Sequence, residues 1–165
     1  MKPQTVGREG VVARLAREVE STGLVAGSIV MTLQGEMPVD ALAPGDRIIT
    51  REAGMAVIRD IRKKEVTCDM IAVMAGSLGH TRPDRDVSLP ADQRILIRDW
   101  RAEALTGRKQ ALIPARTLVD NEFVRLQKDV TVTLYEIELD RAQTIYADGL
   151  EVVSHITAEE LERAA

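Results

Sequence analysis

The stretch from Gly27 to Arg51, GSIVMTLQGEMPVDALAPGDRIITR, constrains the fold of this chain more than any other. It holds three short apolar segments, at residues 29–33, 37–42 and 47–50. Gly35 and the turn Pro44-Gly45-Asp46 separate them. Short apolar runs between turn-forming residues are typical of β-strands, because a helix needs a longer periodic segment. We therefore expect three extended segments packed closely at the start of a domain.

The same pattern of short strands and turns continues to Ser154. Residues 131–140, TVTLYEIELD, alternate between apolar and polar side chains, with a shift near Tyr135 that predicts a β-bulge. Residues 144–153, TIYADGLEVV, predict a hairpin around Asp148-Gly149. Residues 76–94 predict a loop, and residues 100–110 predict a second loop or one helical turn. Closely spaced strands with turns between them predict a mainly β domain, a sandwich or a barrel-like body.

Each end of the chain predicts a short helix. In residues 9–22 the apolar side chains recur at spacings of three and four, which is typical of an amphipathic helix, and Gly23 supplies its stop. Near the other end, Thr157 and Glu160 have the spacing of a capping box, and Ile156 can pack on Leu161. The sequence thus divides into an N-terminal helix (1–22), a β domain (23–155) and a C-terminal helix (156–165).

Composition and charge exclude several classes of partner. Aromatic residues make up 2% of the chain and the net charge is −4, which argues against a stacking platform or a basic footprint for nucleic acid. We interpret the basic clusters, at residues 59–64 and 98–101, as solvated faces. Cys68 is the single cysteine, so no intrachain disulfide can form. With no apolar run of membrane-spanning length and no signal-like start, we expect a cytoplasmic protein without membrane or nucleic-acid partners, export without an N-terminal signal remaining open.

The opening stretch resembles the first block of the Hint fold, the domain shared by inteins and hedgehog C-terminal regions, and bacterial Hint-domain proteins most of all. The residues that carry this likeness are Gly27-Ser28, Glu36, Pro38-Val39, Leu42 and Pro44-Gly45-Asp46. Three later blocks are similar as well: VSLPADQRILIRD, ALIPARTLVDNEFVRL and TLYEIELDRAQTIYADGLEVVS. The four blocks occur in the family's order and span residues 23–154. The resemblance implies a pseudo-twofold, horseshoe-shaped β domain with short terminal helices added.

The resemblance also implies a chemistry, for which the expected side chains are missing. Working members attack the carbonyl before their first residue with a Cys or hydroxyl nucleophile, and a His acts as the general acid on the leaving nitrogen. Here Gly23 occupies the nucleophile position, while Pro90 and Gln93 occupy the Ser/Thr and His positions of the second block. Ala142 stands where the closing block often has a His. His155 lies two residues beyond the expected penultimate His and is followed by Ile156 rather than Asn.

These replacements favour a degenerate Hint domain without catalytic residues, cofactor or metal, which acts as a binding or scaffolding module for an unknown protein partner. The alternative is an autoprocessing domain that uses a hydroxyl in a shifted register, and its candidate nucleophiles are Ser21, Thr22 and Ser28. For Ser28 we expect a structural role, its hydroxyl bonding a nearby backbone group.

Two further candidates have a weaker basis. Cys68 lies beside Asp69, which would raise the pKa of the thiol, so a buried and inert thiol is expected. His80, with Asp84 and Asp86 nearby, could be a base or a metal ligand, but zinc sites assemble three or four ligands, and we expect an exposed side chain. His155 is expected to cap the last helix or to lie exposed before it.

Overall fold

The computed structural model describes residues 22–79 and 82–164 of the chain, and the fold is mainly β, as predicted. The N-terminal helix predicted for residues 9–22 lies outside these ranges except for Thr22, so it stays a prediction. The strands are β1 (Leu24–Val25), β2 (Ile29–Thr32), β3 (Gly35–Pro38), β4 (Arg47–Thr50), β5 (Gly54–Val57), β6 (Asp60–Val73), β7 (Val87–Pro90), β8 (Arg94–Ile97), β9 (Ala111–Pro114), β10 (Val124–Glu138), β11 (Thr144–Ala147) and β12 (Leu150–Val153). The helices are η1 (Val39–Ala41), α2 (Trp100–Thr106), η2 (Ala115–Leu118) and α3 (Ala158–Ala164).

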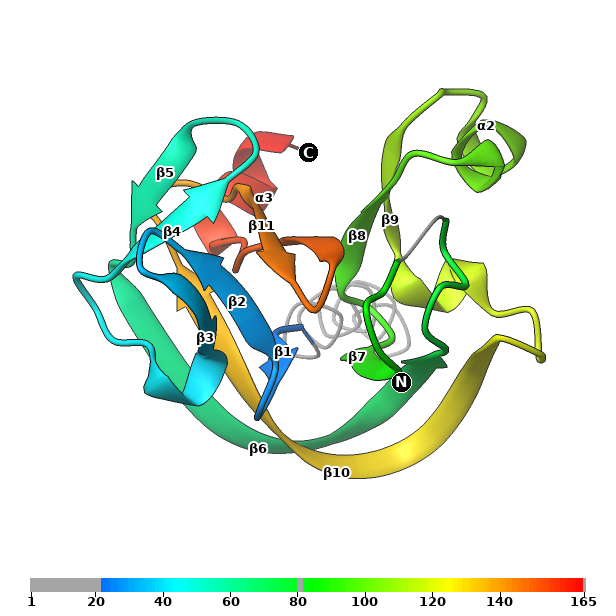
Figure 1. Cartoon of the computed structure of the whole chain (residues 1–165), viewed down its shortest axis with the longest axis horizontal. Coiled ribbons are helices and arrows are strands. Elements are labelled where there is room, and N and C mark those ends of the chain that lie inside the picture. Colours follow the sequence, from blue (N-terminus) through cyan, green and yellow to red (C-terminus); the bar gives the residue numbers. More distant parts are fainter. Residues whose placement is uncertain (1–21, 80–81, 165) are drawn as a thin grey trace, which may run out of the picture.

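The described strands form a four-stranded sheet in the order β1-β10-β6-β7 and an eight-stranded sheet in the order β3-β2-β4-β11-β12-β8-β9, with β5 added beside β4. Figure 1 shows β6 and β10 as two long curved strands that run side by side in a U beneath the other strands. The antiparallel pairing of β6 with β10 joins the two halves of the chain. This is the horseshoe that the resemblance implied.

The two halves repeat one another, which gives the fold its pseudo-twofold character. In the first half the β2–β3 hairpin ends at Pro38, a 3-10 turn follows, and the chain later enters the long strand β6. In the second half the β8–β9 hairpin ends at Pro114, a 3-10 turn follows, and the chain enters the long strand β10. The two prolines have nearly identical backbone angles, φ −63° with ψ 143° or 140°. Proline presets this φ and lacks the N–H that would continue the ladder, so it ends each hairpin at the same place.

The predicted loop at residues 76–94 is wrong in part, because it contains a strand. β7 pairs with β6 from Val87 to Pro90. Its four residues include Pro90 and no clear alternation, and they become a strand only because β6 offers a free edge to pair with. The segment at 100–110 forms the helix α2, with Asp99 accepting a hydrogen bond from the N–H of Arg101 at its start and Gly107 in the left-handed conformation at its end.

The β-bulge predicted near Tyr135 is also wrong. The register of β10 against β6 is regular from Val130 to Glu138, and the irregularity lies between Gln127 and Val130. The apolar pattern changes face near Tyr135 for another reason. The end of β10 is covered on both faces, so that Glu136 and Ile137 are both buried although they point in opposite directions.

The C-terminal helix forms as its capping box predicts. The hydroxyl of Thr157 accepts a hydrogen bond from the N–H of Glu160, and the carboxylate of Glu160 accepts from the N–H of Thr157. No helix in the described part of the chain is both long and apolar enough to cross a membrane.

The predicted hairpin at Asp148-Gly149 is confirmed, and it contacts distant segments. Both residues have positive φ, 50° and 80°, as a tight two-residue turn requires. The N–H of Ile29 donates to the Asp148 carboxylate, and the N–H of Asp84 donates to the Asp148 carbonyl oxygen. A Cβ added at Gly149 would lie 2.5 Å from the Asp84 Oδ1 and 2.9 Å from its backbone nitrogen.

We expect Gly149→Ala to destabilise the fold more than Gly54→Ala does. Gly54 has almost the same φ, 81°, but a Cβ there meets nothing within 4 Å. Both variants carry the backbone strain of about 1–2 kcal/mol, and Gly149→Ala adds an overpacking cost of about 1–3 kcal/mol. Urea unfolding of the two variants measures the difference, and equal losses would contradict the close approach of Asp84 to the turn.

Candidate functional site

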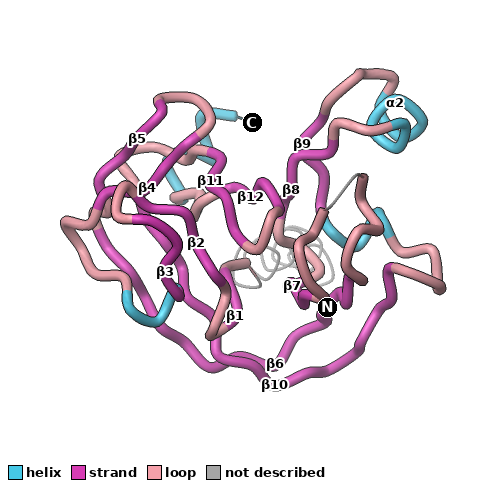
Figure 2. Tube along the Cα trace, in the orientation of Figure 1, coloured by secondary structure: helices cyan, strands magenta, loops and turns pink. Residues whose placement is uncertain are grey.

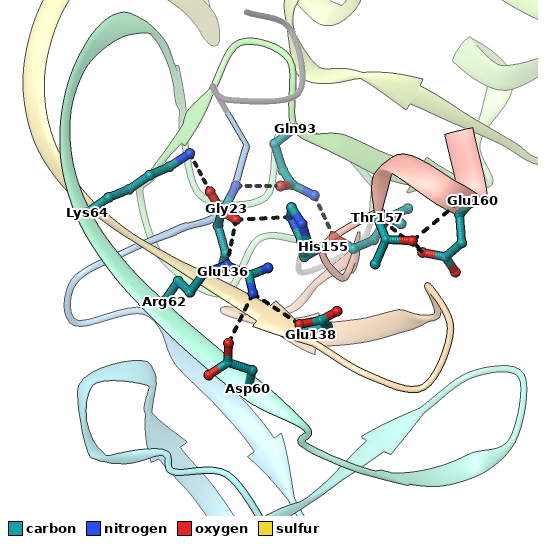
Figure 3. A network of polar contacts seen from close by, with 11 residues as sticks. Gly23, Asp60, Arg62, Lys64, Gln93, Glu136, Glu138, His155, Thr157 and Glu160 are labelled. Atoms are coloured by element: carbon teal, nitrogen blue, oxygen red, sulfur yellow. Dashed lines mark hydrogen bonds and ion pairs between the residues drawn. The ribbon is translucent and has the colours of Figure 1, made fainter. Parts of the chain in front are cut away.

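The two positions that the resemblance assigns to the nucleophile and the general acid are in direct contact. Gly23 lies immediately before β1, and Gln93 lies in the turn between β7 and β8. The backbone N–H of Gly23 donates a hydrogen bond to the Gln93 Oε1 over 2.9 Å (Figure 3). The fold therefore brings together two residues that are 70 positions apart in the sequence.

The amide of Gln93 is held in one orientation by its partners. Its Nε2 donates to the carbonyl oxygens of Val153, at 2.8 Å, and Arg94, at 3.0 Å, while its Oε1 accepts from Gly23. A flipped amide would turn a donor toward the donor of Gly23 and an acceptor toward two carbonyl oxygens, so the network allows only this orientation. The side chain is 3% exposed. Gln93 thus accepts a hydrogen bond from the backbone nitrogen of Gly23. In a working member, a general acid would donate a proton to this nitrogen.

The backbone at Gly23 leaves no room for a side chain. Its φ is +132°, a region that residues with a Cβ rarely adopt. A Cβ built there would lie 2.9 Å from the carbonyl oxygen of Tyr135 and 3.4 Å from the Cβ of Leu134. The neighbouring strand β10 therefore fills the space that a nucleophilic side chain would need.

His155 lines the same small cavity as Gly23 and Gln93, which holds about 10 Å³, room for about one water molecule. The expected exposed position is wrong, since the side chain is 13% exposed. Its Nδ1 lies 3.1 Å from the Glu136 Oε2, yet it makes no aligned hydrogen bond. Burial lowers the pKa of His155 from its ordinary value, although the Glu136 carboxylate opposes this shift.

Glu136 is the centre of a charged network beside this cavity. Its carboxylate is paired with the ammonium of Lys64 and lies 3.6 Å from the Arg62 Nε, both on the neighbouring strand β6. Arg62 also contacts Glu138 and Asp60, each at 3.0 Å, as Figure 3 shows. The expectation that the 59–64 cluster is only a solvated face is therefore wrong for Arg62 and Lys64. Sequence reasoning missed this network because it depends on the β6–β10 register, in which Arg62 lies opposite Glu136.

The remaining site positions of the resemblance lie in other surroundings. Pro90 ends β7 and accepts a hydrogen bond at its carbonyl from the N–H of Gln93. Ala142 does not line the cavity, and its N–H donates to the Glu160 carboxylate of α3. Burial opposes ionisation of Glu160, but hydrogen bonds from the N–H groups of Thr157 and Ala142 lower its pKa.

The candidate nucleophiles within the described residues lie in different surroundings. Thr22 lines the cavity beside Gly23, and Ser21 lies outside the described residues. Ser28 is buried and its hydroxyl donates to the carbonyl oxygen of Val25 over 2.7 Å, the structural role predicted for it. Cys68 is buried on β6, and burial, followed by the charge of Asp69, raises the pKa of its thiol.

His80 lies outside the described residues, so its role as a ligand or base stays untested. Among residues 22–79 and 82–164, no three or more His, Cys, Asp or Glu side chains gather in a way that could hold a metal ion.

Comparison with known proteins agrees with this fold. The sequence model of the Hint domain family matches residues 22–159, most of the chain. The chain therefore belongs to the Hint domain family. No curated protein matches the sequence.

Solved structures support the same fold. A bacterial intein-like domain from Clostridium thermocellum is 17% identical with a TM-score of 0.59, and the match covers 81% of this chain and 98% of that one. The Msm DnaB1 intein splicing domain has a TM-score of 0.52 at 12% identity, over 80% of this chain and 98% of that one. The MchDnaB-1 intein (N145AA) has a TM-score of 0.51, also at 12% identity, over 81% and 99%. At these identities the likeness is one of fold.

We expect Gln93→Leu to destabilise the domain by about 2–4 kcal/mol, because it removes the side-chain partner of three part-buried hydrogen bonds, to the backbone of Gly23, Val153 and Arg94. The matched control is Gln127→Leu on the exposed part of β10, which should change the free energy of unfolding by no more than about 0.5 kcal/mol. Urea unfolding measures both variants. Equal effects would show that Gln93 does not hold the cavity together.

We expect the stability to fall as the pH drops below about 6.5, the ordinary pKa of histidine. Burial lowers the pKa of His155 in the folded protein. Below about pH 6.5 the unfolded chain is therefore protonated at His155 more than the folded chain, which favours unfolding. Its contribution is complete above the unfolded pKa and declines toward the folded pKa. The measurement is the free energy of unfolding between about pH 5 and 7, whose slope against pH should be much smaller in His155→Gln than in wild type. The slope should persist in His80→Gln, and a slope unchanged by His155→Gln would contradict the assignment.

Proposed function

We propose that this Hint domain does not process itself and serves as a binding or scaffolding module for another protein. The observation that carries the proposal is the contact between Gly23 and Gln93. A self-processing domain needs a nucleophile at the first position and a proton donor aimed at the nitrogen of that residue. Gly23 has no side chain, and Gln93 presents an acceptor to that nitrogen.

Of the hydroxyl candidates within the described residues, neither Thr22 nor Ser28 restores this chemistry. Gln93 contacts the N–H of Gly23, so the peptide bond that it addresses joins Thr22 to Gly23. A nucleophilic Thr22 would attack the bond before it, and Ser28 would attack the bond after Gly27. Acyl transfer requires the reacting groups within about 3–3.5 Å in the right orientation, and a one-residue shift of register moves the bond under attack away from Gln93, the position that a general acid would occupy. The Ser28 hydroxyl is also buried and already bonded to Val25.

Exposed apolar side chains on one sheet face support a binding role. Met31 on β2 and Met55 and Val57 on β5 are 40%, 40% and 48% exposed. Met55 lies directly opposite Ile49 of β4, so apolar side chains of the two strands gather here, with the charged Arg47 opposite Val57 and Glu36 opposite Met31. Clustered apolar surface of this kind on a monomer marks interaction sites.

The test is the intact mass of the full-length protein after incubation with hydroxylamine or a strong thiol, which intercept a backbone ester or thioester. We expect a single unchanged mass. A fragment that begins at Ser21, Thr22 or Ser28 would overturn the proposal and return the protein to the self-processing class. The Thr22→Ala variant is the matched control for any such fragment.

The double variant Gly23→Cys with Gln93→His sharpens the test, because it restores both residue types of working members. We expect it to remain uncleaved, since the positive φ of Gly23 and the Tyr135 carbonyl leave no space for a side chain. Cleavage of this variant alone would place the loss of activity in the two side chains and not in the backbone around them.

A further inference from the structure

Three arginines converge on one buried carboxylate on the eight-stranded sheet, and none of these four residues lines the cavity at Gly23. Glu151 of β12 is 2% exposed. Its Oε1 lies 3.1 Å from Arg51, and its Oε2 lies 3.1 Å from both Arg82 and Arg98. We call these four residues the Glu151 cluster.

The fold assembles this cluster from separate elements. Arg51 follows β4, Arg82 lies in the connection between β6 and β7, and Arg98 follows β8. Figure 2 shows β12 between β11 and β8, in agreement with the strand order. Val152 lies opposite Ile95 of β8, and both are buried, so the neighbouring Glu151 points to the opposite face of the sheet. The cluster therefore occupies that opposite face.

The charges of the cluster do not balance. Three guanidinium groups surround one carboxylate, which leaves an excess of two positive charges. Among residues 22–79 and 82–164, no other carboxylate lies within ion-pair distance of these three arginines. The acids next to them in sequence are engaged elsewhere, since Glu52 accepts from the N–H of Thr144 and Asp99 pairs with Arg101.

The arginines also keep unused donors close together and open to solvent. Arg82 and Arg98 both lie 3.1 Å from the same oxygen atom, so their contacting nitrogens are at most twice that distance apart. The three side chains are 34%, 35% and 36% exposed. Each guanidinium has five N–H donors, and the contacts with Glu151 use only some of them. Like charges held this close repel one another unless an anion lies among them.

We propose that the Glu151 cluster binds a phosphate group, either as free inorganic phosphate or as a phosphate monoester. A phosphate near neutral pH carries a charge of about −1.5 to −2, which matches the excess of two. Its oxygens accept paired hydrogen bonds from guanidinium groups that approach from different directions. Glu151 holds the three arginines in position, and the phosphate contacts their solvent-facing donors.

The test is isothermal titration of the full-length protein with inorganic phosphate and, separately, with phosphoserine, at constant ionic strength set by chloride. We expect wild type to bind at least one of them. Binding of both means that the site accepts any phosphate group, and binding of one identifies free phosphate or the monoester as the ligand. Absence of binding by both overturns the proposal.

Arg98→Gln should weaken this binding about tenfold, the size of one lost charge-assisted hydrogen bond. The matched control is Arg94→Gln, which removes the same charge four residues earlier, at the start of β8, from an exposed side chain outside the cluster. Arg82→Gln, in a connection rather than a strand, should weaken binding similarly and serves if Arg98→Gln does not fold. An equal loss in Arg94→Gln, or no loss in either cluster variant, would overturn the proposal.

Glu151→Gln tests the site through a variant that should increase the affinity for phosphate. Removing the carboxylate leaves three unopposed arginines, so the variant should bind phosphate more tightly than wild type. Its melting temperature should also rise more with phosphate than that of wild type, because the anion replaces the missing carboxylate. Weaker binding by folded Glu151→Gln would contradict the charge balance on which the site depends.

Discussion

The antiparallel pairing of β6 with β10 holds the two halves of the chain together and positions both edge strands of the four-stranded sheet. These two long strands come from opposite halves of the chain, and each carries one short edge strand, β7 on β6 and β1 on β10. Gly23 immediately precedes β1 and Gln93 follows β7, so their positions are set by the two long strands. Although β1 and β7 are at opposite edges of this sheet, its curvature brings the two residues into hydrogen-bond contact. The candidate site thus exists only once the halves have joined.

Two buried carboxylates, Glu136 and Glu151, are stabilised in different ways. Removing a carboxylate from water is costly unless opposite charges and hydrogen bonds surround it. Glu136 has Lys64 and Arg62 beside it on the adjacent strand, and Arg62 is shared with two further acids, so positive and negative charges alternate through that network. Glu151 has three arginines from separate segments, and within the described part of the chain no second acid pairs with them. In the network around Glu136 the positive charges are all paired with acids. The Glu151 cluster keeps an excess of positive charge that another anion can neutralise.

Fold and chemistry are separable in this Hint domain. The frame of hairpins, prolines and long strands depends on backbone geometry and aliphatic packing, none of which requires a nucleophile. At Gly23 and Gln93 the same frame holds a hydrogen bond between a backbone N–H and a buried amide. That bond satisfies a part-buried N–H and the oxygen of a buried amide, so these positions stabilise the domain whatever their part in chemistry.

Elements that depend on neighbouring residues alone could be predicted from the amino-acid sequence. The Asp148-Gly149 turn, the capping box at Thr157 and the short strands between turns of residues 27–51 follow from conformational preferences of neighbouring residues. The sequence also assigned Gly23 and Gln93 to positions of the family pattern, because that pattern is an order of residues along the chain. Three other features appear only in the folded chain: β7 is a strand, His155 is half-buried beside Glu136, and three distant arginines meet at Glu151. Each of these depends on the strand pairing and curvature that bring distant segments together, which no local preference encodes.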